Sequence, residues 1–348
     1  MKLGFPGKLK KSASRSLITL RVTRRKILRR VRRYLHAIRH SSTIPVISVL
    51  IARKIERRRG ISLPASPFPS DLASVQLTDL VPHHDPRDPL IPSVVFQTWK
   101  SRTDLPSNYK AWRSSFQRIN PQFLFPLWDD SDNRNFIERN FPWFLSFYDS
   151  YPQEIYRADA VRPFFLYYYG GFYADMDTEC LRPLDDLRAR SDVLLGRMGF
   201  DADFEHSIPN AIMASRPRQL FWLLVIKMMM DEFKNISAPS DFLRLGPEFF
   251  TGPILLKRAV ERYTRASSET WLEVKPVVDL IGPDLTVGTQ AGKVTLLGSD
   301  EWYAMDWTNP IHWMLRRDIL TNRQPLDGDT ARDLFKNSTM VTYWSHTW

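Results

Sequence analysis

Short apolar runs alternate with segments of helical periodicity between residues 91 and 297. Compact runs rich in Val, Ile, Leu and aromatic residues are typical of buried strands, whereas apolar residues three or four apart are typical of helices. We expect strands at 91–99, 123–128, 172–174, 193–196, 208–213, 277–281 and 294–297, and helices at 109–118, 132–140, 157–169, 219–234 and 254–265. This alternation, without a repeat of fixed period, predicts an α/β fold around a mostly parallel sheet.

One stretch joins a helical pattern to a strand and two aspartates. In the helical part, Arg157, Asp159 and Arg162 mark a charged side opposite an apolar side. Two consecutive glycines then end the helix, since glycine tolerates the left-handed backbone of a C-terminal cap. Pro163 departs from this pattern, because it would kink the helix unless it lies in the first turn.

The two aspartates, Asp175 and Asp177, follow directly after the short strand at 172–174. On an extended backbone they would point to the same side of the strand. Two like carboxylates repel each other unless a proton or a cation lies between them. A hard divalent ion that takes oxygen ligands and carries a diphosphate would satisfy them. The chemistry of the chain is therefore expected here.

The spacing of these residues resembles that of a known family, the DXD-motif sugar transferases (glycosyltransferase family 32). This family includes the fungal inositol phosphorylceramide mannosyltransferases and the initiating outer-chain α-1,6-mannosyltransferase. Its pattern R-x-D-x-x-R followed by G-G-x-Y-x-D-x-D is matched by Arg157, Asp159, Arg162, Gly170, Gly171, Tyr173, Asp175 and Asp177. Weaker similarities lie at 91–100, 128–130, 210–211 and 251–253, and residues 1–88 are not covered.

The resemblance implies a GT-A fold, a retaining transfer and a nucleotide-sugar donor held through Mn²⁺ or Mg²⁺. Asp177 would be the direct metal ligand, and Asp175 would bind the ribose or a metal-bound water. His346 would be a third metal or diphosphate contact, because imidazole suits Mn²⁺; the alternative is an exposed tail histidine. Double displacement would need a carboxylate nucleophile, and since spacing singles out none, we favour same-face attack assisted by the leaving diphosphate.

Asp159 and Arg162 would hydrogen-bond the hydroxyls of the donor sugar. The alternative is an ion pair on the helix surface, worth a few tenths of a kcal/mol, and Arg157 has the same alternative. We expect catalysis to depend on Asp159, Arg162, Asp175 and Asp177. The residues expected to contact the nucleotide sugar are Gln97, Thr98, Trp99, Arg157, Asp159, Arg162, Asp175, Asn210 and Trp348.

Three of these contacts rest on position in the predicted sheet. Gln97, Thr98 and Trp99 end the first strand, where an open α/β sheet binds its nucleotide. Trp99 has plain core packing as its alternative. Asn210 is expected to bond substrate, although an asparagine at a strand end also caps turns.

Charge divides the chain into parts. Residues 1–60 hold 19 Lys and Arg and one Glu, a net charge of +18, whereas the remaining 30 basic and 37 acidic residues give −7. The basic arm alternates Arg and Lys with aliphatic residues over 14–39, which fits a helix on an anionic membrane surface or a disordered basic tail. Nucleic-acid binding is not expected, because the arm interleaves almost no aromatic residues on which bases could stack. The apolar segment 41–52 falls short of the roughly 20 residues that span a bilayer, so a short signal anchor is poorly supported. An Arg- and Ser-rich transit peptide is a further alternative for the arm.

We therefore predict three parts: a basic arm (1–60), a proline-rich linker (61–90) and a catalytic domain (91–348). The hydrophobic fraction of 43% supports a sizeable core, and the single cysteine, Cys180, excludes an intrachain disulfide. The favoured function is transfer of mannose from GDP-mannose to a glycan or sphingolipid acceptor at the lumenal side of the Golgi membrane. The alternatives are a UDP-galactose or UDP-N-acetylglucosamine donor, a catalytically inactive membrane-associated binding module, and a metal-dependent phosphohydrolase.

Overall fold

A computed structural model of the chain describes residues 43–58, 88–265, 269–306 and 308–345. The chain divides into two compact units. One combines Met1–Ser62 with Trp307–Asp318, and the other combines Leu63–Asp306 with Ile319–Trp348. The predicted three-part division of the chain stays a prediction.

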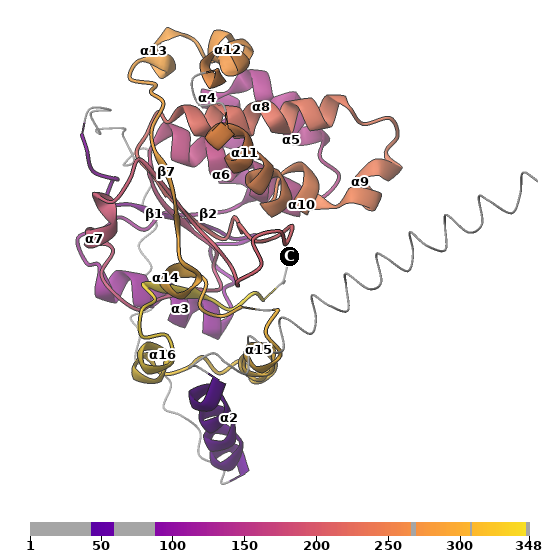
Figure 1. Ribbon diagram of the computed structural model, residues 1–348. Coiled ribbons are helices and arrows are strands. Elements are labelled where there is room, and N and C mark those ends of the chain that lie inside the picture. Colours follow the sequence, from indigo (N-terminus) through magenta and orange to yellow (C-terminus); the bar gives the residue numbers. More distant parts are fainter. Residues whose placement is uncertain (1–42, 59–87, 266–268, 307, 346–348) are drawn as a thin grey trace, which may run out of the picture. The chain divides into compact units, whose positions relative to one another are not determined.

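The larger unit is built on a six-stranded sheet of order β2-β1-β3-β6-β5-β7 (Figure 1). The pairs β2–β1, β1–β3 and β5–β7 are parallel, and β6 alone runs antiparallel to both of its neighbours. The strands are β1 (Val95–Thr98), β2 (Leu127–Trp128), β3 (Gly171–Ala174), β5 (Val193–Gly196), β6 (Ile212–Ser215) and β7 (Val294–Leu297). The predicted class, α/β with a mostly parallel sheet, is confirmed.

Helices cover both faces of this sheet. Figure 1 shows α6, α8 and α11 on one side and α3 and α14 on the other. Every residue of β1, β3, β5 and β6 is buried, as expected for strands covered on both faces. The helices of 11 or more residues that lie wholly in this unit are α3 (Ser107–Ile119), α4 (Asp130–Asn140), α6 (Glu154–Tyr168), α8 (Leu220–Lys234), α11 (Pro253–Arg265) and α12 (Thr270–Ile281).

Short helical segments complete the larger unit, and α15 (Pro310–Asn322) crosses the boundary between the two units. The short segments are η2 (Pro142–Phe144), α5 (Leu145–Ser150), α7 (Asp185–Arg188), α9 (Ser240–Leu245), α10 (Pro247–Phe250), α13 (Pro283–Thr286), α14 (Ser299–Trp302) and α16 (Gly328–Leu334).

One predicted strand is wrong: residues 277–281 form the end of helix α12. The buried residues of this helix are Thr270, Val274, Val277 and Ile281, which recur at intervals of three and four. That spacing is helical, and a five-residue apolar run at its end is ambiguous when taken alone. The longer window therefore decides the structure of this segment.

Helix α6 also differs from its predicted amphipathic character. All residues from Ala158 to Tyr167 are buried, so the charged side of the pattern does not face solvent. The helix lies against α4, α8 and strands β3 and β6. Pro163 sits in its interior, beyond the first turn, and the helix is continuous across it. Packing on all sides stabilises a helix that proline would otherwise interrupt.

A second, two-stranded sheet brings the C-terminal segment to the larger unit. Strand β4 (Thr178–Cys180) pairs antiparallel with β8 (Met340–Thr342), with Thr178 opposite Thr342. Because β4 begins immediately after Asp177, the residues that follow β8 lie beside the two aspartates.

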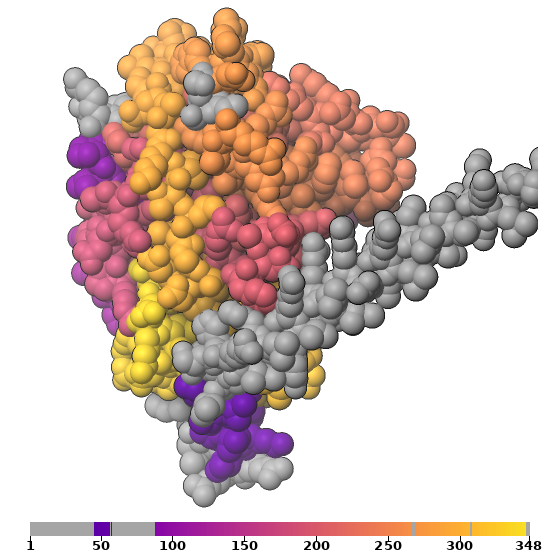
Figure 2. Space-filling view, viewed as in Figure 1, coloured from indigo at the N-terminus to yellow at the C-terminus, as the bar shows by residue number. Residues whose placement is uncertain are grey.

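The smaller unit contains helix α2 (Thr43–Arg58), the indigo segment of Figure 2. Arg53 Nε and Asp318 Oδ2 are 2.8 Å apart, and Arg57 also pairs with Asp318. The helix predicted at 14–39 lies outside the described residues. Among the residues that the structure describes, no helix is long and apolar enough to cross a membrane.

Candidate active site

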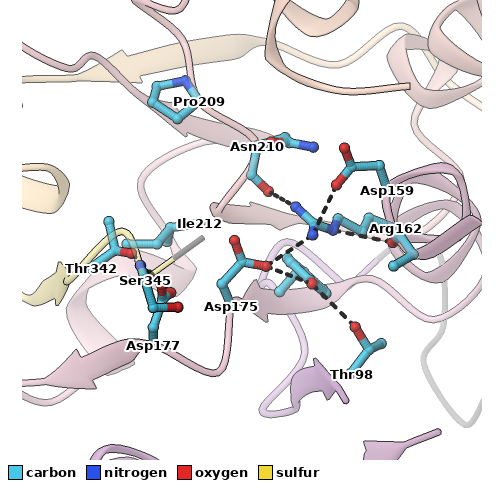
Figure 3. A network of polar contacts seen from close by, with 12 residues as sticks. Thr98, Asp159, Arg162, Asp175, Asp177, Pro209, Asn210, Ile212, Thr342 and Ser345 are labelled. Atoms are coloured by element: carbon cyan, nitrogen blue, oxygen red, sulfur yellow. Dashed lines mark hydrogen bonds and ion pairs between the residues drawn. The ribbon is translucent and has the colours of Figure 1, made fainter. Parts of the chain in front are cut away.

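The two aspartates of the motif lie on a turn. Asp175 follows β3 and Asp177 precedes β4, and Thr178 N donates a hydrogen bond of 3.0 Å to the carbonyl oxygen of Asp175. The backbone of this segment is therefore a turn and not the extended segment that was expected. The turn instead directs Asp175 towards helix α6 and Asp177 towards the C-terminal segment (Figure 3).

Arg162 lies at the centre of a buried polar cluster (Figure 3). Its Nη2 atom is 2.9 Å from Asp159 Oδ1 and 3.0 Å from Asp175 Oδ1, and its Nη1 atom donates a 3.0 Å hydrogen bond to the carbonyl oxygen of Asn210. The Arg162 side chain is 2% exposed and that of Asp159 is 8% exposed. The alternative of an ion pair on the helix surface is thus wrong for these two residues.

Tyr173 completes the cluster from β3. The Arg162 guanidinium carbon lies 4.6 Å from the centre of the Tyr173 ring, a cation–π arrangement. The Tyr173 hydroxyl donates a 2.8 Å hydrogen bond to Asp175 Oδ1, and Thr98 Oγ1 lies 3.4 Å from the same hydroxyl. The predicted residue Thr98 is therefore joined to the motif through Tyr173.

Burial dominates the electrostatics of the two carboxylates beside Arg162. It raises the pKa of Asp175 to about 7 and that of Asp159 to about 6. In both cases Arg162 opposes the shift by favouring the charged carboxylate, whereas the nearby charge of Asp177 raises the pKa of Asp175 further. Arg162 therefore compensates only part of the negative charge gathered here.

Asp177 is buried and holds the C-terminal segment. Its Oδ1 accepts a hydrogen bond from Thr342 Oγ1 at 3.2 Å, and its Oδ2 accepts one from Ser345 N at 2.5 Å. The backbone adds a third link, because Tyr343 N donates to the carbonyl oxygen of Asp177 at 2.9 Å. The last described residues of the chain are thereby fixed beside the motif.

The donor set suits a hard divalent cation that also binds phosphate. In the part of the chain that the structure describes, no three His, Cys, Asp or Glu side chains cluster closely enough to hold a metal alone. Mg²⁺ commonly binds through one or two carboxylates and takes its other ligands from substrate phosphates and water. The charge of Asp177 raises the pKa of Asp175, and a cation would remove this repulsion. Asp175 and Asp177 therefore fit such an ion.

The other contacts predicted at the end of β1, Gln97 and Trp99, are buried. Gln97 Oε1 accepts a 2.7 Å hydrogen bond from Arg113, while Gln97 Nε2 has no hydrogen-bond partner among the described residues. Trp99 Nε1 donates to the carbonyl oxygen of Asp104 at 3.2 Å, and the ring lies 4.8 Å from that of Tyr109. Trp99 is thus packed in the core, which was the alternative to a contact with the nucleotide.

The remaining predicted residues have different surroundings. Arg157 donates from Nε to Glu154 at 2.9 Å and from Nη1 to the carbonyl oxygen of Tyr151 at 2.6 Å. It therefore pairs with its neighbours in the chain, which was its alternative. The buried side-chain amide of Asn210 faces Asp159 and lowers the pKa of that carboxyl by hydrogen bonding. His346 and Trp348 lie outside the described residues.

Two further residues shape the cluster. A Cβ atom at Gly252 would lie 3.0 Å from Asp159 Oδ2, so the 251–253 turn approaches this carboxylate closely only because residue 252 is glycine. Tyr303 places its hydroxyl against the backbone next to Asn210. The sequence contains a signal for Gly252, in the similarity at 251–253, but none for Tyr303, whose partners are more than 90 residues away along the chain.

Comparison with protein families identifies the segment that carries the motif. Residues 106–194 match the family described as "Glycosyltransferase sugar-binding region containing DXD motif". These residues are thus similar to a DXD-type sugar-binding region. The resemblance inferred from the sequence is thereby confirmed.

Relatives in fungi match parts of the chain. Inositol phosphoceramide mannosyltransferase 2 of Schizosaccharomyces pombe is 34% identical over 178 residues, 51% of this chain and 48% of the relative. Mannosyl phosphorylinositol ceramide synthase SUR1 of Saccharomyces cerevisiae is 34% identical over 191 residues, which are 54% of this chain and 46% of the relative. Initiation-specific alpha-1,6-mannosyltransferase of the same yeast is 33% identical over 102 residues, which are 27% of this chain and 21% of the relative. The chain spans about half the length of the first two relatives.

Proposed function

We propose that this protein is a metal-dependent glycosyltransferase that moves mannose from GDP-mannose to a sphingolipid or glycan acceptor. The observation that carries the proposal is the buried cluster of Asp159, Arg162 and Asp175 next to Asp177, within a segment that matches the DXD sugar-binding region. The relatives whose names specify mannosyl transfer favour mannose over the galactose or N-acetylglucosamine of UDP-sugars.

The residues of the cluster divide the work of binding a nucleotide sugar. Asp175 and Asp177 would hold Mn²⁺ or Mg²⁺, which when bound supplies Lewis-acid stabilisation of the leaving diphosphate. Asp159 and the Asn210 side-chain amide, which face each other, offer an acceptor and a donor for sugar hydroxyls. Arg162 holds both carboxylates in place from helix α6, so the site is ordered before substrate arrives.

We propose retention of configuration by attack on the same face of the sugar from which the diphosphate leaves. Asp129, a carboxylate that directly follows strand β2, serves another role. Its Oδ1 accepts hydrogen bonds from Ser131 N and Asp132 N as the N-cap of α4, and its Oδ2 is 3.2 Å from Arg102 Nε. A capping carboxylate paired with arginine is poorly suited to attack a sugar.

The smaller unit supports a membrane-associated location. Helix α2 exposes Ile47, Ile51 and Ile55, spaced four residues apart, within an arm of net charge +18. An apolar stripe with surrounding basic residues is typical of helices that lie on an anionic bilayer. We propose that this helix contacts the lumenal face of the Golgi membrane, where a sphingolipid acceptor is presented.

A donor screen tests the activity. Purified full-length protein is incubated with Mn²⁺ and either GDP-mannose, UDP-galactose or UDP-N-acetylglucosamine, and sugar release is measured with and without EDTA. GDP-mannose hydrolysis that EDTA abolishes is the expected result. A preference for a UDP-sugar would replace the donor, and absence of both binding and hydrolysis would favour an inactive binding module.

A further inference from the structure

The hydroxyl of Tyr303 is buried against one short backbone segment. Tyr303 follows helix α14 and has an exposed fraction of 0%. Its hydroxyl oxygen accepts a 2.7 Å hydrogen bond from Ile212 N, and it lies 3.0 Å from the carbonyl oxygen of Ile212 and 3.2 Å from that of Pro209. A single side-chain group therefore binds both ends of the segment 209–212.

That segment supplies two carbonyl oxygens to the candidate site. The carbonyl oxygen of Asn210 accepts the 3.0 Å hydrogen bond from Arg162 Nη1. The carbonyl oxygen of Ala211 accepts a 2.8 Å hydrogen bond from the backbone N–H of Asp175. Both residues lie just before β6 begins at Ile212, so the regular β6 pairing does not include them. The Tyr303 hydroxyl provides the anchoring that the ladder does not.

The space that the Tyr303 ring occupies depends on a glycine. A Cβ atom at Gly196, the last residue of β5, would lie 2.7 Å from the ring. On another side the ring stacks on Trp344, with 5.4 Å between ring centres and an angle of 25°. Trp344 precedes Ser345, whose N–H binds Asp177. Tyr303 thus contacts both backbone segments that hold the motif.

We propose that Tyr303 is a positioning residue for sugar transfer, which acts through the carbonyl oxygens of Asn210 and Ala211 and does not touch the sugar. The expected effect of Tyr303 on turnover rests on the proposed function. Loss of the hydroxyl leaves Ile212 N without its buried acceptor and frees segment 209–212 to shift. A displacement of about 1 Å in such a site costs about 100-fold in rate. The stack on Trp344 remains in a phenylalanine variant, so the change isolates the hydroxyl.

The test compares Tyr303→Phe with Tyr167→Phe in the full-length protein. Tyr167 is equally buried, and its hydroxyl donates to the carbonyl oxygen of Leu285 at 2.9 Å and lies 2.7 Å from Thr289 Oγ1. Tyr167→Phe therefore also removes the hydrogen bonds of a buried tyrosine hydroxyl, but at a place that does not contact Arg162 or Asp175. Two quantities are measured: kcat and KM for the donor identified in the screen, and hydrogen–deuterium exchange in peptides covering 208–215 and 171–178.

Positioning predicts that Tyr303→Phe lowers kcat/KM about tenfold or more and accelerates exchange in both peptides. Tyr167→Phe should leave kcat/KM within about twofold of the wild type and leave both peptides unchanged, although both variants lower the melting temperature. A Tyr303→Phe enzyme within about twofold of wild-type turnover, or with unchanged exchange in these peptides, would overturn the inference. A wild-type protein that turns over no donor contradicts the proposed function, and exchange alone then decides the positioning role.

Discussion

Arg162 Nη2 and Asp159 Oδ1 are 2.9 Å apart within one turn of helix α6, and neither side chain is accessible enough to be solvated. Arg162 is also 3.0 Å from Asp175, so one guanidinium serves two carboxylates, with Asp177 close enough to raise the pKa of Asp175. Three carboxylates and one guanidinium leave an excess of negative charge in a low-dielectric site. Such a site favours a cation and a ligand that brings hydrogen-bond donors, as a metal-bound nucleotide sugar does.

Removing Arg162 should be costly for stability as well as activity. Arg162→Met leaves Asp159 and Asp175 buried without their partner, and breaking a buried ion pair costs about 3–5 kcal/mol. The control is Arg157→Met on the same helix, since Arg157 pairs with the 61% exposed side chain of Glu154 and such pairs contribute at most about 1 kcal/mol. Urea denaturation followed by circular dichroism gives both values, and equal losses would show that the Arg162 cluster is not buried as described.

Neutralising Asp177 separates its hydrogen bonding to the C-terminal segment from its proposed role as a metal ligand. Asp177→Asn keeps an oxygen that can accept from Ser345 N but removes the charge that a divalent ion requires. We expect transfer to fall about 100-fold or more with the melting temperature lowered by only a few degrees. The exposed pair of Asp279 with Lys275 provides the control, Asp279→Asn, which should retain wild-type rates. Mn²⁺-dependent transfer by Asp177→Asn at wild-type rates would refute the metal assignment.

Glu179 makes stability depend on pH. Burial raises its pKa from 4.5 to about 7, and the hydrogen bond of 2.6 Å from Tyr343 only partly opposes this. Between these pH values the folded protein binds a proton that the unfolded chain releases, so the free energy of unfolding falls as pH rises. Glu179→Gln removes this dependence while keeping an acceptor for Tyr343.

The expected measurement is a gain in stability for Glu179→Gln relative to wild type that grows from pH 4.5 to pH 8 and reaches on the order of 1–3 kcal/mol. Chemical denaturation at several pH values gives the difference directly. A difference that is flat across this range would mean that Glu179 titrates near its ordinary value in the folded state.

The apolar stripe of α2 should determine membrane binding. Replacing Ile47, Ile51 and Ile55 together by Ser removes the exposed apolar surface without changing the charge of the arm. We expect binding to phosphatidylserine-containing vesicles, measured by co-sedimentation, to fall about tenfold or more, because burial of aliphatic side chains dominates interfacial affinity. Leu272→Ser, which changes a 74% exposed residue of α12, is the control. Equal binding by the triple variant would show that the stripe does not contact lipid.

Local sequence was sufficient to locate the helix, glycine break and strand of the motif, although packing on all sides stabilises the helix across Pro163. It was also sufficient for the buried character of β3 and β5, whose short runs contain no charged residue. Strand β1 is equally buried although it contains Gln97 and Thr98. The same local view failed for α12, because five residues cannot distinguish a strand from the end of a helix. It also could not tell that α6 is covered on all sides, since burial depends on what packs against a helix.

The composition of the site was decided by tertiary structure. Asp159, Arg162 and Asp175 could be named from their spacing, but only the packing of α6 against β3 and β6 places one guanidinium between two carboxylates. Asp177 could be named too, yet its bonds to Thr342 and Ser345 arise because β4 pairs with β8 from the far end of the chain. Tyr303 had no sequence signal, because a hydroxyl that binds backbone 91 residues away is specified by where the chain folds and not by its neighbours.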